Sequence, residues 1–233
     1  MKWLRFYMWG LLFFLWAPLL VVLYKGCNFL AFERLLQNSE VMISFRNSLF
    51  LGIATAAIST VLGLATAFAL PVFPSKIRGW ITGSLLLPLV LPEIAFGIAY
   101  LVWFQFLGLS LGWISLLISH FAFTFSFVVL VLKTSVFNLD RSLSDAARDL
   151  GASPIEVFIH AILPQMMPGI IAGAMMAFSL SLDDFLISFF VKGIDQITLP
   201  IKVYSMMHLR IGPEIYALSV VDRKSTRLNS SHT

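Results

Sequence analysis

The segment "DAARDLGASPIEVFIHAILP", residues 145–164, brings acids, bases and helix-boundary residues together in a chain that is otherwise mostly apolar. Gly151 predicts the end of a short helix, because glycine is the usual residue where the backbone must turn left-handed. Ser153 and Glu156 predict the start of a second helix through a capping box, with proline at its first position. The segment is therefore expected to form two short helices that meet at Gly151, the second of which ends at Pro164.

Each expected helix carries one apolar stripe at helical spacing. The first stripe consists of Leu143, Ala146, Ala147 and Leu150, and the second of Ile155, Phe158, Ile159 and Ile162.

Three uses are open for such a hairpin. A helix in the lipid interface would carry lysine and arginine on its polar face, whereas here acids outnumber bases. The hairpin can also cap a helix bundle. Docking in a groove on a cytosolic partner is the favoured use.

The composition places the rest of the chain in a membrane. Hydrophobic residues make up 59% and charged residues 12% of the 233 residues, and the mean hydropathy is +0.90. Soluble domains usually have about 25% charged residues. A membrane-spanning helix needs about 20 mainly apolar residues. Five runs meet this requirement: 6–24, 48–73, 81–109, 113–132 and 169–191. Lysine and arginine are nearly balanced between the two sides, which leaves the orientation open.

Prolines and small residues predict how these spans pack. Pro88 and Pro92 are expected to kink the third span next to Glu93, and a broken helix beside an acid indicates a cavity. Small residues four positions apart predict close helix contacts in the second and fifth spans. They are Gly63 and Ala67, and Gly169, Gly173 and Ala177.

The opening segment resembles the EAA loop of the permease subunits of binding-protein-dependent ABC transporters, bacterial importers of the inner membrane. That motif consists of Glu-Ala-Ala, three residues, Gly, nine residues and Ile-x-Leu-Pro. Ala146, Ala147, Gly151, Leu163 and Pro164 match it, while Asp145 replaces the glutamate and Ala161 the isoleucine. The resemblance extends from about residue 45 to 221. The stretches "SLSLDDFLISFFVKG" and "TLPIKVYSMM" are most similar to the polyamine (spermidine/putrescine) branch.

The resemblance implies an all-α, polytopic transmembrane bundle of the type I ABC importer kind, with five complete spans and a truncated sixth. It also implies four kinds of partner: a second permease subunit, two ATPase subunits, a periplasmic solute-binding protein and membrane lipid. The chain has no phosphate-binding loop motif, so ATP and Mg are expected on the ATPase and no enzyme activity here. A multi-pass location in the bacterial inner membrane follows, and no nucleic acid is expected as a partner.

Within this resemblance, the hairpin at residues 140–164 is expected to couple the permease to the ATPase. The coupling residues are Asp145, Ala146, Ala147, Gly151, Ala152, Ser153, Phe158, Leu163 and Pro164. A rigid pair of helices seated in a moving groove transfers that motion to the spans attached to it.

Acids inside the expected spans mark the candidate solute pathway, because a carboxylate in the bilayer is costly and is by default a functional hypothesis. Asp184 shares a polar stripe with Ser181 and Ser188, and Asp183 projects about 100° away. Asp184 is therefore expected on the pathway, with Asp183 as a partner or a second ligand. Glu93 shares a face with Tyr100, and carboxylates beside aromatic rings suit a polycation. The pathway residues are Glu93, Tyr100, Asp183, Asp184 and Ser188. The alternative is that these acids pair with lysine or backbone groups in a subunit interface.

The remaining expectations concern metal sites, other functions and the C-terminus. His120 has no second histidine or cysteine near it in the sequence, so no metal site is expected. An ion-coupled transporter or channel, or an ABC permease for an amino acid, iron or phosphate, stays an alternative. Residues 1–221 are expected to form the permease domain. The polar tail 222–233 interrupts a final span and is expected to be disordered or foreign sequence.

Overall fold

The computed structural model describes residues 3, 7–17 and 37–208, and within these residues every regular element is helical. The chain divides into two compact units, residues 1–45 and 46–233. In the first unit, residues Tyr7–Ala17 form an apolar helix inside the first expected span. The rest of that span and the polar tail 222–233 lie outside the described residues.

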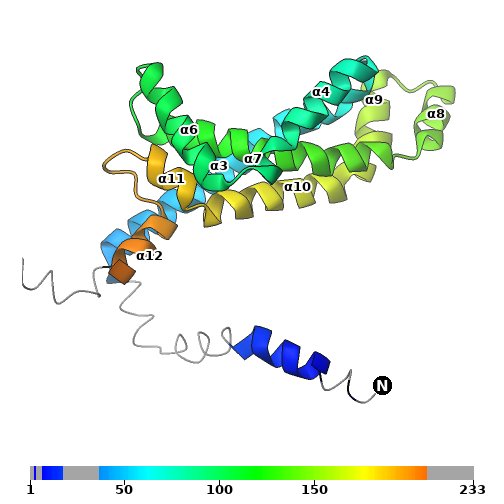
Figure 1. Cartoon of the computed structure of the whole chain (residues 1–233). Helices are drawn as coiled ribbons and strands as arrows, with labels where there is room; N and C mark the ends of the chain where they lie inside the picture. Colours follow the sequence, from blue (N-terminus) through cyan, green and yellow to red (C-terminus); the bar gives the residue numbers. More distant parts are fainter. Residues whose placement is uncertain (1–2, 4–6, 18–36, 209–233) are drawn as a thin grey trace, which may run out of the picture. The chain divides into compact units, whose positions relative to one another are not determined.

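Between residues 39 and 208, the described helices follow one another with short connections (Figure 1). They are α3 (Ser39–Ala69), η1 (Leu70–Val72), α4 (Ser75–Leu85), α5 (Leu87–Val90), α6 (Glu93–Phe106), α7 (Trp113–Phe137), α8 (Arg141–Asp149), α9 (Pro154–Val157), η2 (Phe158–Ile162), α10 (Leu163–Asp183), α11 (Leu186–Val191) and α12 (Leu199–His208). The element η2 is a single π-helical stretch between α9 and α10.

Three continuous helical stretches of the described residues are long and apolar enough to cross a membrane: Ser39–Val72, Trp113–Phe137 and Pro154–Asp183. A fourth is possible if the pair Ser75–Val90 and Glu93–Phe106, bent by 110°, forms one broken span. The break at Pro92 confirms the expected kink, since proline removes a helix hydrogen bond. Figure 1 shows α4 and α6 leaving this break in different directions.

The expected fifth span, 169–191, is wrong at both ends. Its helix starts earlier and is interrupted at Asp184, after which the short α11 follows. The expected helix end at Pro164 is also wrong, because α9 continues through η2 into α10. Pro164 lies at the start of α10, where the π-helical pattern replaces the usual bonding: Leu163 N–H donates to the Phe158 carbonyl, five residues back. A proline in the first turn of a helix removes no intrahelical hydrogen bond.

The longest helices pack through the small residues that the sequence indicates. A Cβ added to Gly63 of α3 would lie 2.8 Å from Val128 Cγ1 of α7, and one added to Gly173 of α10 would lie 3.4 Å from the same atom. Ala67 and Ala177 are buried in the same cluster. The small side chains thus let α3 and α10 approach α7 closely, as expected for helices in lipid.

Helix α6 packs on α11 at Gly97, and this contact gives a testable prediction. A Cβ there would lie 2.7 Å from Phe190 Cδ2 and 3.2 Å from the Leu186 carbonyl oxygen. We expect Gly97→Leu to lower the stability of the purified protein by about 1–3 kcal/mol, because the α11 backbone must move away. Gly83→Leu is the matched control, since a Cβ at Gly83 meets no atom within 4 Å. Equal melting temperatures for the two variants would contradict the contact.

Candidate functional site

The hairpin at residues 140–164 carries helix caps at the expected positions. The side chain of Asp140 accepts a hydrogen bond from the Ser142 N–H at 2.9 Å and so caps α8. The hydroxyl and N–H of Ser142 together hold the pKa of the Asp140 carboxyl below its ordinary value. At the other end of α8, Gly151 has φ +84°, which confirms the left-handed turn. Ser153 and Glu156 form the expected capping box.

The turn at Gly151 is a Schellman motif, which closes α8 with two backbone hydrogen bonds. The Gly151 N–H donates to the Arg148 carbonyl at 2.8 Å. The Ala152 N–H donates to the Ala147 carbonyl at 3.1 Å. The expected coupling residues Ala147, Gly151 and Ala152 thus set the angle between the two helices of the hairpin.

The apolar stripe of α8 has no cover within the described residues. Leu143 is 51% exposed and Leu150 89% exposed, and no residue of α8 is buried. Asp145 lies on the same exposed helix and pairs with Arg148 at 3.6 Å. A stripe that served only to cap this chain's own bundle would be buried against it. The exposure therefore favours a partner outside the chain.

Two contacts anchor the hairpin to the long helices. The ring of Phe158 packs against Phe68 at the end of α3, with ring centroids 5.9 Å apart. Gln165 in α10 accepts a hydrogen bond from the Asp140 N–H at 2.9 Å and donates to the Ala161 carbonyl at 2.7 Å. Sequence analysis missed Gln165, because a single amide carries no pattern. Leu163 and Pro164 lie next to it at the start of α10.

At the other end of α10, the side chain of Asp184 organises the break before α11. Its Oδ1 accepts from the Ile187 N–H at 3.1 Å, and its Oδ2 accepts from the N–H and the hydroxyl of Ser188, both at 2.7 Å. Asp184 is only 4% exposed. The carboxylate thus caps the short helix α11, because it accepts hydrogen bonds from backbone N–H groups that the break leaves without a helical partner.

His120 of α7 also contacts residues on both sides of this helix break. Its Nδ1 lies 2.8 Å from Ser181 Oγ and its Nε2 lies 2.9 Å from Ser188 Oγ. The same Nε2 lies 3.2 Å from Asp184 Oδ2. His120 is 2% exposed, so α7 is tied to both sides of the break inside the protein. We call His120, Ser181, Asp184 and Ser188 the histidine cluster.

Sequence analysis gave His120 no role, although one feature of the sequence indicates its burial. Ser115, Ser119 and Thr124 lie at helical spacing around it on an otherwise apolar helix, and all three are buried. A polar face on a membrane helix is expected to point toward the protein interior.

Glu93 lies where the break at Pro92 meets the break at Asp184. This residue opens α6 directly after Pro92, and its carboxyl lies close to that of Asp184. The breaks at Pro92 and Asp184 therefore lie next to each other at the histidine cluster.

The other expected pathway residues lie apart from this cluster. Asp183 is exposed at the end of α10 and is near enough to Glu93 for their charges to interact. Tyr100 lies farther along α6, where its ring stacks on Phe104 with centroids 6.1 Å apart. The structure thus brings Glu93, Asp184 and Ser188 together. Asp183 is exposed and Asp184 is buried, whereas the sequence analysis expected Asp184 to line the pathway.

Comparisons with known proteins agree with this architecture. The family described as "Binding-protein-dependent transport system inner membrane component" matches residues 59–220, which include the hairpin and both helix breaks. The spermidine/putrescine transport system permease protein PotC of Escherichia coli strain K12 is 35% identical over 190 residues, covering 82% of this chain and 72% of PotC. The putrescine permease protein PotI of the same strain is 33% identical over 228 residues, covering 89% and 81%.

A solved structure shares the fold. It is a crystal structure of a bacterial ABC transporter involved in the import of the acidic polysaccharide alginate. The TM-score is 0.62 with 18% sequence identity, and the match covers 83% of this chain and 69% of the other. At this identity the likeness concerns the fold alone. The family match over most of the chain, the relatives and the shared fold show that this chain belongs to the inner membrane components of binding-protein-dependent transport systems.

Proposed function

We propose that this chain forms the solute pathway of an ATP-driven polyamine importer and couples it to a separate ATPase through residues 140–164. The relatives named as spermidine/putrescine and putrescine permeases support the solute class. The acids Glu93 and Asp183 near the helix breaks supply negative charge suited to a cationic solute.

The observation that carries the coupling role is the exposed stripe of α8 on a firmly anchored hairpin. Leu143 and Leu150 are exposed, while Phe158 and Gln165 fix the hairpin to α3 and α10. A groove that binds the stripe and moves would therefore move the long helices as well. Figure 1 shows α8 beyond the ends of α7 and α10, where a partner has access to it.

The proposed assembly contains a second permease subunit, two ATPase subunits that hold ATP and Mg, and a periplasmic solute-binding protein, in the bacterial inner membrane. Residues 1–221 form the permease domain in this proposal, with five complete spans. Glu93 and Asp183 face the solute, and Tyr100 belongs to the wall beside them. Asp184 and Ser188 do not contact the solute in this proposal. They stabilise the break between α10 and α11.

Reconstitution tests the proposal. The chain is purified with its partner subunits, placed in liposomes and supplied with binding protein loaded with radiolabelled putrescine. We expect uptake only with ATP and only from the full complex, because this chain has no phosphate-binding loop. The control is liposomes that contain this chain alone. Putrescine transport by the lone chain without ATP would instead support an ion-coupled transporter or a channel, and uptake of other solutes only would refute the polyamine assignment.

A further inference from the structure

A groove with a volume of about 500 Å³ runs along one face of α4. It is open because Gly79 and Gly83 have no side chains, and a Cβ added to either glycine would meet no atom within 4 Å. The opposite face of α4 packs on α7, where Ile81 and Leu85 join the cluster around Val129. The groove therefore lies on the side of α4 that faces away from α7.

One end of the groove carries a positive charge. Lys76 lines this end together with Ser75, in the first turn of α4, and both are exposed. In the part of the chain that the structure describes, no ion pair to Lys76 occurs, and α4 itself contains no acidic residue. The ammonium group of Lys76 therefore has hydrogen-bond donors for an anion from outside the chain.

The other end of the groove is apolar. Leu87 closes it, and the hydroxyl of the adjacent Ser84 donates a hydrogen bond to the Trp80 carbonyl at 3.0 Å, so its polarity is satisfied. The indole ring of Trp80 borders the groove and is 81% exposed. Tryptophan is typical of the membrane–water interface, so this ring marks the depth at which lipid headgroups give way to acyl chains.

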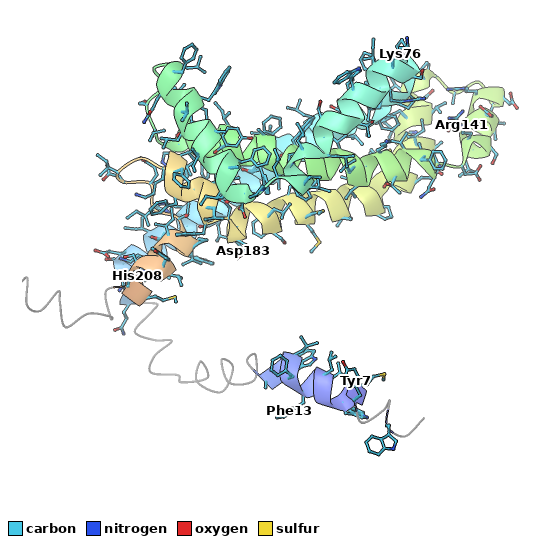
Figure 2. All side chains as sticks on the ribbon, viewed as in Figure 1. Tyr7, Phe13, Lys76, Arg141, Asp183 and His208 are labelled. Carbon is cyan, nitrogen blue, oxygen red and sulfur yellow. The ribbon has the colours of Figure 1, made fainter. Side chains whose placement is uncertain are left out.

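The groove has the length of a lipid chain in one leaflet. From Lys76 to Leu87 the helix rises about 16 Å at 1.5 Å per residue, close to half of the roughly 30 Å hydrocarbon core of a bilayer. Its charged end lies on the side of the hairpin, because Phe68, shortly before α4, packs against Phe158. Figure 2 shows Lys76 toward the same end of the described helices as Arg141 of the hairpin.

A phospholipid has both parts that such a groove accommodates. Its phosphate accepts a charge-assisted hydrogen bond from a lysine, and its acyl chain is stabilised by packing over an apolar helix face. A zwitterionic headgroup brings its own ammonium group close to the lysine, so an anionic headgroup fits the charged end better. A soluble phosphate has the charge but lacks the apolar part.

We propose that this groove binds an anionic phospholipid, with the headgroup phosphate at Lys76 and one acyl chain along Gly79, Trp80 and Gly83. The site goes beyond the proposed function, since it requires neither the polyamine nor the ATPase. It makes a lipid the partner of the helix that leads into the break at Pro92.

Fluorescence quenching tests this site in the assembled complex, held in nanodiscs of phosphatidylcholine. A fixed minor fraction of the lipid carries bromine on its acyl chains, either as phosphatidylglycerol or as phosphatidylcholine. The signal of Trp80 is the difference between the unmodified complex and a Trp80→Phe complex. We expect phosphatidylglycerol to occupy the groove roughly fivefold more strongly than phosphatidylcholine, the preference that one lysine near a membrane surface supplies.

Three variants separate the groove from a general effect of surface charge. Lys76→Gln should remove the preference for phosphatidylglycerol. Arg78→Gln is the matched control, because Arg78 is exposed on the same helix but does not line the groove, so the preference should remain. Gly79→Leu fills the middle of the groove and should lower the quenching of Trp80 by both lipids. The fold should tolerate this change, because the added Cβ meets open space.

Equal quenching by the two lipids would overturn the site, as would an equal loss of preference in Lys76→Gln and Arg78→Gln. Absence of Trp80 quenching by both lipids would show that another subunit covers the groove, and the lipid site would then be wrong. Glycerol 3-phosphate added to the nanodiscs should leave the quenching by phosphatidylglycerol unchanged. Loss of that quenching would assign the groove to a soluble phosphate instead.

Discussion

Gly151→Pro is expected to reduce recovery of the ATPase with this chain by at least about tenfold and to bring uptake to background. The native φ of +84° is closed to proline, whose ring fixes φ near −65°. Proline also lacks the N–H that donates to the Arg148 carbonyl. Even an ordinary residue held left-handed costs about 1–2 kcal/mol, and 1.4 kcal/mol is a factor of about ten in an equilibrium. The angle between α8 and α9 is therefore lost.

Gly151→Asn is the control for this experiment. Asparagine keeps the backbone N–H and tolerates the left-handed region better than most residues, so association with the ATPase should be largely retained. Size-exclusion profiles of all variants show whether the long helices still form a folded protein. A folded Gly151→Pro variant that binds the ATPase as well as the unmodified chain would refute the coupling role of the hairpin.

His120→Leu is expected to cause the largest loss of stability of any single change at the helix breaks. The substitution leaves the buried Asp184 carboxylate without its histidine partner, and it removes the polar contacts to Ser181 and Ser188. Removing a hydrogen-bond partner of a buried polar group costs about 1–3 kcal/mol. For a chain of this size we expect the melting temperature of the purified chain to fall by roughly 2–12 °C.

His160→Leu is the matched control, because His160 is exposed and bonds to a carbonyl in its own helix. Its melting temperature should stay close to that of the unmodified chain. The double variant H120L/D184N tests the mechanism, because it removes the stranded charge and should be less destabilised than the sum of its two single changes. Strict additivity would show that His120 and Asp184 do not act together.

The hairpin was predictable from sequence because its determinants are local. The left-handed Gly151 and the capping box of Ser153 and Glu156 act within a few residues, and the structure shows both. The kink at Pro92 and the small residues facing α7 were predictable for the same reason, since proline and glycine have direct effects on the backbone.

The features that sequence analysis missed depend on partners distant along the chain. Asp184 interrupts its helix with help from His120, more than sixty residues earlier, and a hydropathy run does not reveal such a contact. The sequence predicts a helix end at Pro164, because the proline is visible in the sequence whereas the π-helical hydrogen bond from Leu163 to Phe158 appears only in the structure. The roles of the coupling and pathway residues remain predictions for the experiments above.

The π-helical element η2 has a consequence for the evolution of this subunit. Its wider hydrogen bonding accommodates an extra residue between the hairpin and the membrane core. Since each residue of an α-helix advances the azimuth by about 100°, deleting one position within Phe158–Ile162 would swing α8 around the axis of α10 by about that angle. Single-residue insertions and deletions here would therefore re-aim the hairpin and change its contacts at Phe158 and Ile162, whereas the same changes inside α7 would disrupt the packing of the long helices.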